Sequence, residues 1–220
     1  MALRAYHRPV SDPGSGATPD PISDEDLAAI TVGELQPVNA TIELAPSDPE
    51  WPRTFEREAA AIQSVLGERV RLLEHVGSTA VPGLPAKPIV DIVLEVADSA
   101  DEPAYIPALE AAGYTLRIRE PGWYEHRVLK GPTVNINLHV FSAGCPETQR
   151  MLAFRDHLRR DEADRVRYER TKLELAARTW RYVQHYADAK SGVVREIMAR
   201  ALSDSGEQVG PAGPAGDAGS

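Results

Sequence analysis

The sequence predicts an α+β domain, in which a mixed and mostly antiparallel sheet is followed by a helical C-terminal region. Short apolar runs bounded by Gly, Pro and Asp alternate with helical patterns up to residue 141, as expected for strands and helices packed in layers. After Gly144 the apolar spacing is helical as far as residue 202. A chain of 220 residues can bury one ordinary core, so a single domain with tails is expected.

The secondary-structure elements are expected at definite positions. The apolar residues Phe55, Ile62 and Leu66 follow helical spacing, and the helix is expected to end at Gly67, because glycine commonly follows the last helical turn. Helices are predicted over residues 52–66, 103–112, 147–160, 162–180, 182–189 and 193–202. Strands are predicted over residues 42–44, 70–76, 89–96, 114–119, 124–129 and 134–141.

The domain is expected to span residues 41–202, between two tails. Residues 1–40 are predicted to form a largely disordered N-terminal arm, because its first part is rich in Pro, Gly, Ser and Asp. One short helix is expected within this arm, where Ser23 and three acidic residues precede Leu27. Residues 203–220 are rich in Gly, Pro and Ala, and they are predicted to be a second disordered tail.

Charge and composition limit the classes of partner. The formal net charge is −9, yet residues 147–202 carry thirteen basic and nine acidic side chains. This balance favours a phosphorylated or carboxylated small molecule and argues against nucleic acid. The single cysteine, Cys145, excludes an internal disulfide and a cysteine-based zinc site. No apolar run approaches ~20 residues and no signal peptide is recognisable, so we expect a cytoplasmic protein without a membrane partner; the oligomeric state is left open.

A turn of small residues is the first candidate for ligand binding. The strand that ends at residue 76 breaks into Gly77, Ser78 and Thr79, and such a turn lets backbone N–H groups approach an anionic ligand closely. His75 precedes this turn and is expected either to orient a ligand or only to end the strand. Lys87 follows it and is expected either to neutralise a bound anion or to be an ordinary surface lysine.

A carboxylate on the next strand is the second candidate. Asp91 leads a strand in which residues 91, 93 and 95 share one face, so Glu95 is a further candidate on that face. In a later strand Asn137 and His139 also share one face. Asp91 and His139 are therefore predicted either to hold a divalent ion or to act as an acid–base pair. The alternative for His139 is a strand histidine that is only hydrogen-bonded or solvated.

The helical half adds two cationic candidates. Arg155 lies in the first long helix of this region, and Lys172 follows Tyr168 by one helical turn in the second. If these helices close over the turn at residues 77–78, both side chains would neutralise phosphate oxygens. The alternative is that they belong to ordinary solvated helix faces.

An ordered series of motifs covers nearly the whole core, from residue 42 to residue 202. Its members are Asp48-Pro49-x-Trp51-Pro52, His75-x-Gly77-Ser78-Thr79-Ala80-Val81-Pro82-Gly83-Leu84, Lys87-Pro88-x-x-Asp91, Leu138-His139-Val140, Phe154-Arg155-Asp156-x-Leu158-Arg159, Tyr168-x-x-x-Lys172 and Tyr186-x-x-x-Lys190. In these motifs the chain resembles the GrpB family. The resemblance implies a nucleotidyltransferase-like fold of the DNA-polymerase-β type, and it implies no particular activity.

The chain departs from the superfamily pattern that this resemblance implies. The usual site has three carboxylates that hold two metal ions, whereas here Val93 and His139 stand at two of the three expected places. Asp91 and His139 would then hold a single ion, with Mg²⁺ as the candidate.

The leading hypothesis is a nucleotidyltransferase-like enzyme that acts on a small molecule and binds a phosphorylated ligand such as a nucleoside triphosphate. One alternative is an enzyme that modifies or ligates a metabolite without nucleotidyl transfer. The other is a non-catalytic ligand-binding or accessory protein.

Overall fold

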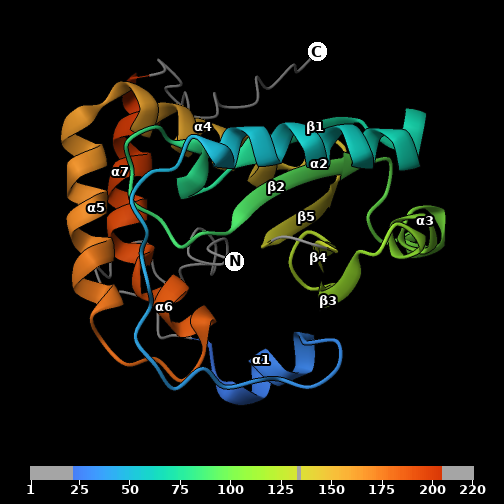
Figure 1. Ribbon diagram of the computed structural model, residues 1–220, viewed down its shortest axis with the longest axis horizontal. Helices are drawn as coiled ribbons and strands as arrows, with labels where there is room; N and C mark the ends of the chain where they lie inside the picture. Colours follow the sequence, from blue (N-terminus) through green and yellow to red (C-terminus); the bar gives the residue numbers. More distant parts are fainter. Residues whose placement is uncertain (1–21, 133–134, 205–220) are drawn as a thin grey trace, which may run out of the picture.

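A five-stranded mixed sheet lies at the centre of the protein (Figure 1). The computed structural model describes residues 22–132 and 135–204. The sheet order is β1-β2-β5-β4-β3; β2 and β5 run parallel, and the other neighbours are antiparallel. The strands are β1 Leu72–Val76, β2 Val90–Val96, β3 Thr115–Glu120, β4 His126–Lys130 and β5 Ile136–Ser142.

Helices cover the two faces of the sheet differently. The larger hydrophobic core lies on one face, where helices α2 (Glu50–Leu66) and α3 (Ile106–Ala111) pack against Ile92, Leu94 and Leu138. On the opposite face Val93 and Phe141 pack against Met151 of helix α4 (Pro146–Arg160). The C-terminal helices are α4 Pro146–Arg160, α5 Glu162–Ala176, α6 Val183–Ala189 and α7 Ser191–Asp204. The α+β class predicted from the sequence is therefore the observed one.

The C-terminal helices are joined to the sheet through the connection between β1 and β2. Val81 and Leu84 of this connection are buried among Phe154, Tyr168 and Ile197 of helices α4, α5 and α7. The connection therefore carries the small-residue turn to the point where the sheet and the helical group meet. Within the described ranges, none of the helices combines the length and apolar character that a membrane span requires.

Part of the predicted N-terminal arm is ordered. Helix α1 (Asp24–Ile30) begins after Ser23, whose hydroxyl accepts a hydrogen bond from the backbone N–H of Asp26. Leu27 is buried in a small cluster with Ile22 and Tyr182, and this contact holds residues 22–30 on the domain. The arm predicted over residues 1–40 is thus packed from residue 22 onward. The disorder predicted for residues 1–21 and 205–220 lies outside the described residues.

Two element predictions are corrected by the structure. Residues 42–44 do not form the expected strand: the isolated bridges Ala40–Trp180 and Ala45–Ala86 flank them, and the backbone N–H of Ile42 donates to the carbonyl of Ala176 instead of to a strand. The helix expected over residues 162–180 ends at Ala176, since the next four residues turn back to reach the bridge at Ala40. The predicted starts of the strands lie one or two residues early, which is the usual uncertainty at element ends.

Candidate functional site

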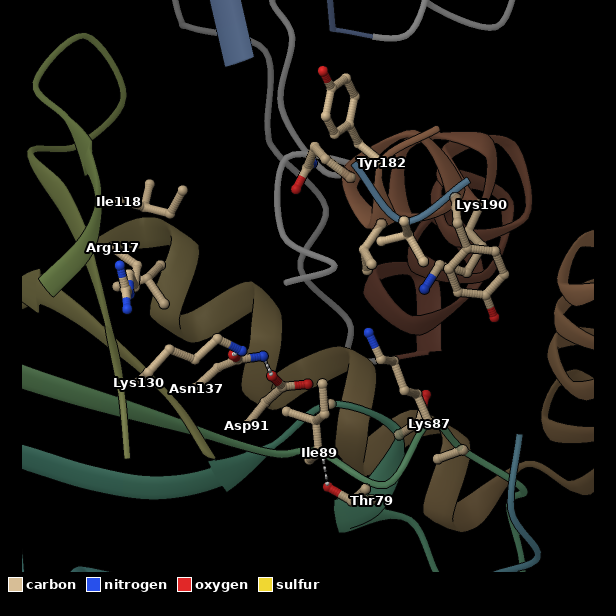
Figure 2. A pocket seen from close by; sticks show the side chains of 18 of the residues that line it. Thr79, Lys87, Ile89, Asp91, Arg117, Ile118, Lys130, Asn137, Tyr182 and Lys190 are labelled. Atoms are coloured by element: carbon tan, nitrogen blue, oxygen red, sulfur yellow. Dashed lines mark hydrogen bonds between the residues drawn. The ribbon is translucent and has the colours of Figure 1, made fainter. Parts of the chain in front are cut away.

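A cavity of about 320 Å³ lies where the sheet, the N-terminal segment and the C-terminal helices meet (Figure 2). Its lining includes Asp91 of β2, Asn137 of β5 and Lys130 of β4, together with residues of α1, α5 and α6 and of the segments that flank them. Pockets of this size hold small molecules rather than macromolecular segments. Seven predicted site residues line this cavity: Gly77, Ser78, Thr79, Lys87, Asp91, Asn137 and Lys172.

Three polar side chains form a row across the cavity floor (Figure 2). Asp91 pairs with Asn137 in the parallel register, and Asn137 pairs with Lys130 in the antiparallel register. The Lys130 ammonium donates to Asn137 Oδ1 at 2.5 Å. Asn137 Nδ2 in turn donates to Asp91 Oδ1 at 2.6 Å. The carboxylate of Asp91 is therefore oriented by the amide beside it, and the amide by the lysine.

The small-residue turn approaches Asp91 as closely as a backbone can. Gly77 has φ 72° and ψ −171°, a conformation that is essentially restricted to glycine. A Cβ atom at this position would lie 2.6 Å from Asp91 Oδ2. Glycine is therefore required both by the backbone conformation and by the space that the Asp91 carboxylate occupies.

His75 packs against the turn and contacts the side chain of Thr79. Its Nε2 lies 3.0 Å from the hydroxyl of Thr79, and its ring stacks on Phe55 with centroids 5.1 Å apart. Burial lowers the pKa of His75 to about 4, so the ring is neutral at neutral pH. Of the two roles expected for His75, the structure places it among the groups that hold the turn, outside the cavity lining.

Lysines surround Asp91 inside the cavity. Lys87 and Lys190 extend toward it from the β1–β2 connection and from the end of α6 (Figure 2). Burial lowers the pKa of Lys190 to about 8, although the attraction of Asp91 opposes this change. Burial also lowers the pKa of Lys87 and of Lys130, again against the attraction of Asp91. Ammonium groups are thus concentrated where water is partly excluded.

Two tyrosines and a fourth lysine form the helical wall. Lys172 donates to the carbonyl of Pro85, and its ammonium lies 5.0 Å from the centroid of the Tyr168 ring. The ammonium of Lys190 lies 4.4 Å from the centroid of the Tyr186 ring. The buried Tyr186 hydroxyl has no hydrogen-bond partner within the described structure. The two Tyr-x-x-x-Lys motifs therefore present their lysines to one cavity.

Four predicted site residues are not among the residues that line the cavity: His75, His139, Arg155 and Glu95. The Arg155 guanidinium donates to Glu74 at 2.7 Å, to the His75 carbonyl at 2.8 Å and to Asp156 at 2.8 Å, so it fastens α4 to β1. Glu95 is four residues along the strand from Asp91, about 13 Å away. Its Oε2 accepts from the backbone N–H of Gly144 at 3.0 Å, which places it beyond the cavity.

The structure also adds cavity residues that sequence reasoning missed. Lys130, Lys190 and Arg117 line the cavity, yet none of them is among the site residues that the sequence predicts. Lys190 stood in a recognised motif, but helical spacing alone did not indicate which way that face points. Lys130 meets Asn137 only because of the β4–β5 register, and a single sequence does not reveal strand register.

His139 lies beneath Asp91 and is fully buried. Its Nε2 is 3.5 Å from Asp91 Oδ1 and has no hydrogen-bond partner in the described part of the chain. Burial lowers the pKa of His139 to about 3, against the attraction of Asp91, so the imidazole is neutral at neutral pH. The two groups predicted as a metal or acid–base pair are thus neighbours.

The donor set at this point does not fit a resident Mg²⁺ ion. Magnesium prefers an octahedral shell of oxygen ligands. Here the cavity floor offers the carboxylate of Asp91, and the imidazole nitrogen of His139 lies buried behind it at 3.5 Å, whereas the Asn137 carbonyl already accepts from Lys130. The positive charges of the nearby lysines would also repel a magnesium ion at this position.

Three potential metal ligands do converge elsewhere among residues 22–132 and 135–204. The group is His157, Asp161 and Asp164, on α4 and α5. However, Asp164 already accepts from His157 at 2.7 Å and from two nitrogens of Arg200. These contacts explain the group as an ion-pair network that joins α4, α5 and α7.

Comparison with known proteins identifies the family. The family model described as GrpB protein matches residues 41–200. The chain belongs to the GrpB family. A UPF0157 protein of Halalkalibacterium halodurans is 62% identical over 181 residues, which cover 82% of this chain and 93% of that protein. A UPF0157 protein of Streptomyces coelicolor is 46% identical over 160 residues, which cover 73% of this chain and 84% of that one.

A solved structure supports the fold independently. The crystal structure of the conserved protein GrpB from Enterococcus faecalis matches with a TM-score of 0.66 and 32% identity, covering 75% of this chain and all of that one. The resemblance drawn from the motifs over residues 42–202 is confirmed, and so is the α+β class. A nucleotidyltransferase-like placement is consistent with this family.

Proposed function

We propose that the cavity binds a small phosphorylated ligand, with a nucleoside triphosphate as the first candidate, and that the protein is a cytoplasmic nucleotidyltransferase-like enzyme. One observation carries the proposal. The chain contains only four lysines, Lys87, Lys130, Lys172 and Lys190, and all four line this cavity. Apart from the histidines, every other basic side chain of the protein is an arginine. Lysine therefore occurs only around this cavity, and its compact ammonium differs from the planar guanidinium found elsewhere.

The charge balance of the lining favours an anion. Besides the four lysines the lining contains Arg117, and its only carboxylates within the described structure are Asp91 and Glu34. Buried ammonium groups are costly unless they are paired, and the lowered pKa of Lys190 reflects that cost. A bound phosphate would restore an ion pair to each lysine that it reaches. The cavity is therefore expected to gain most from a ligand with several negative charges.

The chemistry assigned to the site follows from the same arrangement. The lysines would stabilise negative charge on the phosphate oxygens, including charge that develops as a phosphorus–oxygen bond breaks. Asp91 lies at the floor, with His139 buried directly behind it, and an acceptor hydroxyl or amine would lose its proton to Asp91. In nucleotidyl transfer the acceptor then bonds to the α-phosphorus and pyrophosphate leaves.

The second candidate is a cavity that binds its ligand without nucleotidyl transfer. It is favoured by the floor of the cavity, where Asp91 is the only carboxylate among the described strand residues of the lining. Two-ion nucleotidyl transfer needs more anionic ligands than this. A ligase or modifying enzyme for a metabolite, or an accessory protein that binds one, would need only the lysines and the glycine turn.

The test is calorimetric titration of the full chain with ATP, GTP, CTP, UTP, pyrophosphate and inorganic phosphate. Each titration is done with and without Mg²⁺, because an ion that accompanies the ligand stays a prediction. We expect Lys190→Ala and Lys87→Ala to weaken binding at least tenfold, since each removes a charge-assisted contact. Arg178→Ala removes an exposed cation outside the lining and is the matched control.

The outcomes separate the candidates. Binding of no nucleotide, pyrophosphate or phosphate under any condition would overturn the proposed ligand class. Binding of a triphosphate without release of pyrophosphate, in the presence of a panel of hydroxyl and amine acceptors, would favour the second candidate. Equal weakening by Arg178→Ala and by the lysine variants would mean that binding depends on overall charge and lies outside this cavity.

A further inference from the structure

A line of three buried polar side chains continues from Asp91 into the sheet. Glu120 of β3, His126 of β4 and His139 of β5 lie side by side, with at most 4% of each residue exposed. Glu120 Oε2 is 2.6 Å from His126 Nδ1, and His126 Nε2 is 3.1 Å from His139 Nδ1. The last gap, from His139 Nε2 to Asp91 Oδ1, is 3.5 Å. The line therefore runs from the interior of the sheet to the cavity floor.

Aromatic packing holds the two imidazoles in place. The rings of His126 and His139 are nearly parallel, with an interplanar angle of 7° and centroids 5.3 Å apart, as an in-plane hydrogen bond between their nitrogens requires. Phe141 stacks on His126 at 4.6 Å, and Trp123 meets His126 edge-on at 5.0 Å. Phe141 and Trp123 restrict the His126 ring and burial restricts the His139 ring, so the ring nitrogens keep their positions along the line.

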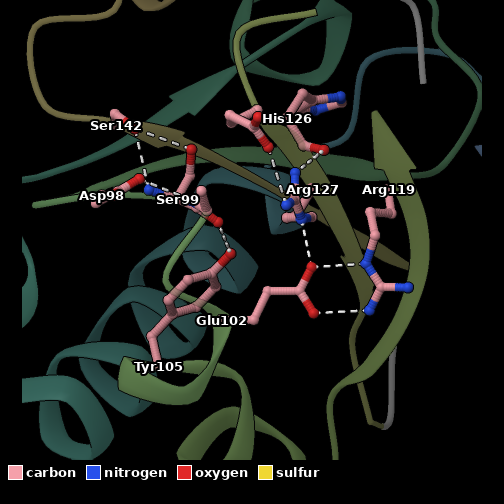
Figure 3. A network of polar contacts seen from close by, with 10 residues as sticks. Asp98, Ser99, Glu102, Tyr105, Arg119, His126, Arg127 and Ser142 are labelled. Carbon is pink, nitrogen blue, oxygen red and sulfur yellow. Dashed lines mark hydrogen bonds and ion pairs between the residues drawn. The ribbon is translucent and has the colours of Figure 1, made fainter. Parts of the chain in front are cut away.

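A second network fastens β4 from the other face of the sheet (Figure 3). Arg127, the residue after His126, donates to Glu102 at 2.6 Å, and Arg119 donates to both oxygens of Glu102 at 2.7 Å. Because Arg127 is only 4% exposed, loss of its partner Glu102 would leave a buried charge without its main ion pair, which is strongly destabilising. The strand that carries His126 is thus held from both faces.

The number of protons on this line is limited. Burial lowers the pKa of His126 and of His139, so both rings are neutral and carry one proton each. The line has three contacts that one proton each can bridge: Glu120 with His126, His126 with His139, and His139 with Asp91. With Glu120 and Asp91 both present as carboxylates, the two ring protons fill two contacts, and the third contact is left without one.

The distances indicate which contact lacks the proton. At 2.6 Å and 3.1 Å, the two inner contacts have hydrogen-bond lengths, whereas 3.5 Å is too long for a hydrogen bond of ordinary strength. Each imidazole then carries its proton on Nδ1: His126 donates to Glu120, and His139 donates to His126. The bare Nε2 of His139 is left facing the Asp91 carboxylate.

We infer that Glu120 and His126 are positioning residues that hold His139 in the Nδ1–H tautomer, so that its bare Nε2 and Asp91 together accept one proton at the cavity floor. The proton would come from the hydroxyl or amine of a bound acceptor, and this source rests on the proposed function. The acceptor's O–H or N–H bond breaks, its electron pair stays on the acceptor, and the proton goes first to Asp91, which lines the cavity. The Asp91 carboxyl then passes it to His139 Nε2, 3.5 Å away, where the new N–H bond forms and Asp91 becomes a carboxylate again. The third proton completes the line, and His139 then donates to Asp91.

The tautomer can be measured on the unliganded full chain. Long-range ¹H–¹⁵N correlation spectra of ¹⁵N-histidine-labelled protein distinguish a protonated from a bare ring nitrogen. We expect His126 and His139 both to be protonated at Nδ1 and bare at Nε2. A His139 ring that carries its proton on Nε2 in the wild-type protein would overturn the inference, and this measurement requires no variant to fold.

Two variants test the roles of Glu120 and His126. In Glu120→Gln the new amide can donate to His126 Nδ1, so the line reverses and His139 is expected to carry its proton on Nε2 and donate to Asp91. In His126→Phe the ring packing is retained but the nitrogen acceptor is lost, and the same reversal is expected. Glu125→Gln is the control, since this half-exposed neighbouring carboxylate bonds to Arg127 outside the line.

An unchanged His139 tautomer in both Glu120→Gln and His126→Phe would refute the positioning role. So would a reversal that Glu125→Gln produces equally. Failure of the phosphate ligands to bind would remove the proposed function but leave the tautomer result standing. The two proposals therefore fail separately.

Discussion

Replacement of Gly77 by alanine tests the central geometry of the cavity. The φ of 72° and ψ of −171° at this position cost a residue with a Cβ roughly 1–3 kcal/mol. The new Cβ would also stand 2.6 Å from Asp91 Oδ2 and 3.3 Å from Asp91 Cγ, so the carboxylate has to move. Movement breaks the 2.6 Å bond from Asn137, and a hydrogen bond to a charged group contributes about 1.5–3 kcal/mol.

Together these effects predict a loss of about 2.5–6 kcal/mol in the free energy of unfolding. For a chain of this size, this corresponds to a fall of about 10 °C in Tm. Gly83→Ala is the matched control: Gly83 also has a positive φ, of 79°, but a Cβ added there would meet no atom of the described residues within 4 Å. It is expected to lose only about 1–2 kcal/mol, from backbone strain alone.

Urea denaturation of the two variants measures the difference directly. Calorimetric titration of the folded variants measures their affinity for the phosphate ligand. The affinity of Gly77→Ala should be at least tenfold lower than that of the wild type, whereas Gly83→Ala should bind like wild type. If Gly77→Ala is no less stable than Gly83→Ala, the close approach between the turn and Asp91 does not exist in solution, and the reasoning fails.

Three further predictions concern pH and ion pairs. Burial raises the pKa of Glu147 to about 8, so the folded state binds this proton more tightly than the unfolded state does. The stability that this proton contributes is fully present below about pH 4.5. Between pH 4.5 and pH 8 the free energy of unfolding therefore falls by about 1.4 kcal/mol per pH unit. Glu147→Gln should therefore raise the Tm at pH 8 but not at pH 4, as measured by calorimetry, and an equal effect at both would contradict this. The two arginines at Glu102, with the hydrogen bond from Arg119 first, lower the pKa of Glu102 to about 2, so its stability contribution is present above about pH 4.5 and lost as the pH falls toward 2. Glu102→Gln leaves Arg127 without its main partner and should cost about 3 kcal/mol at pH 7 in urea denaturation, with little cost at pH 2; a pH-independent cost would refute the ion-pair explanation. Because the pKa of Lys190 is about 8, phosphate binding should weaken up to tenfold per pH unit above pH 8, and this decline should be absent in Lys190→Ala.

Local sequence determined much of the fold and half of the site. Apolar periodicity and capping residues placed the strands and helices to within a few residues, because these patterns act over one or two turns of chain. The Gly77-Ser78 turn and Asp91 were also found from the sequence, since a strand, a small-residue turn and a strand carboxylate lie close together along the chain. The motif series was specific enough to identify the family.

Only the tertiary structure decided which distant side chains meet. Arg155 and Lys172 had the same status in the sequence, yet one fastens α4 to β1 and the other lines the cavity. The β4–β5 register brought Lys130 to Asn137, and the sheet order β5-β4-β3 built the line from Glu120 to His139. A one-residue shift of register would turn each of these side chains to the opposite face. Strand register and helix rotation are set by the packing of the whole core. Local sequence patterns therefore predict the turn and its carboxylate, whereas only the folded structure shows which lysines lie around them.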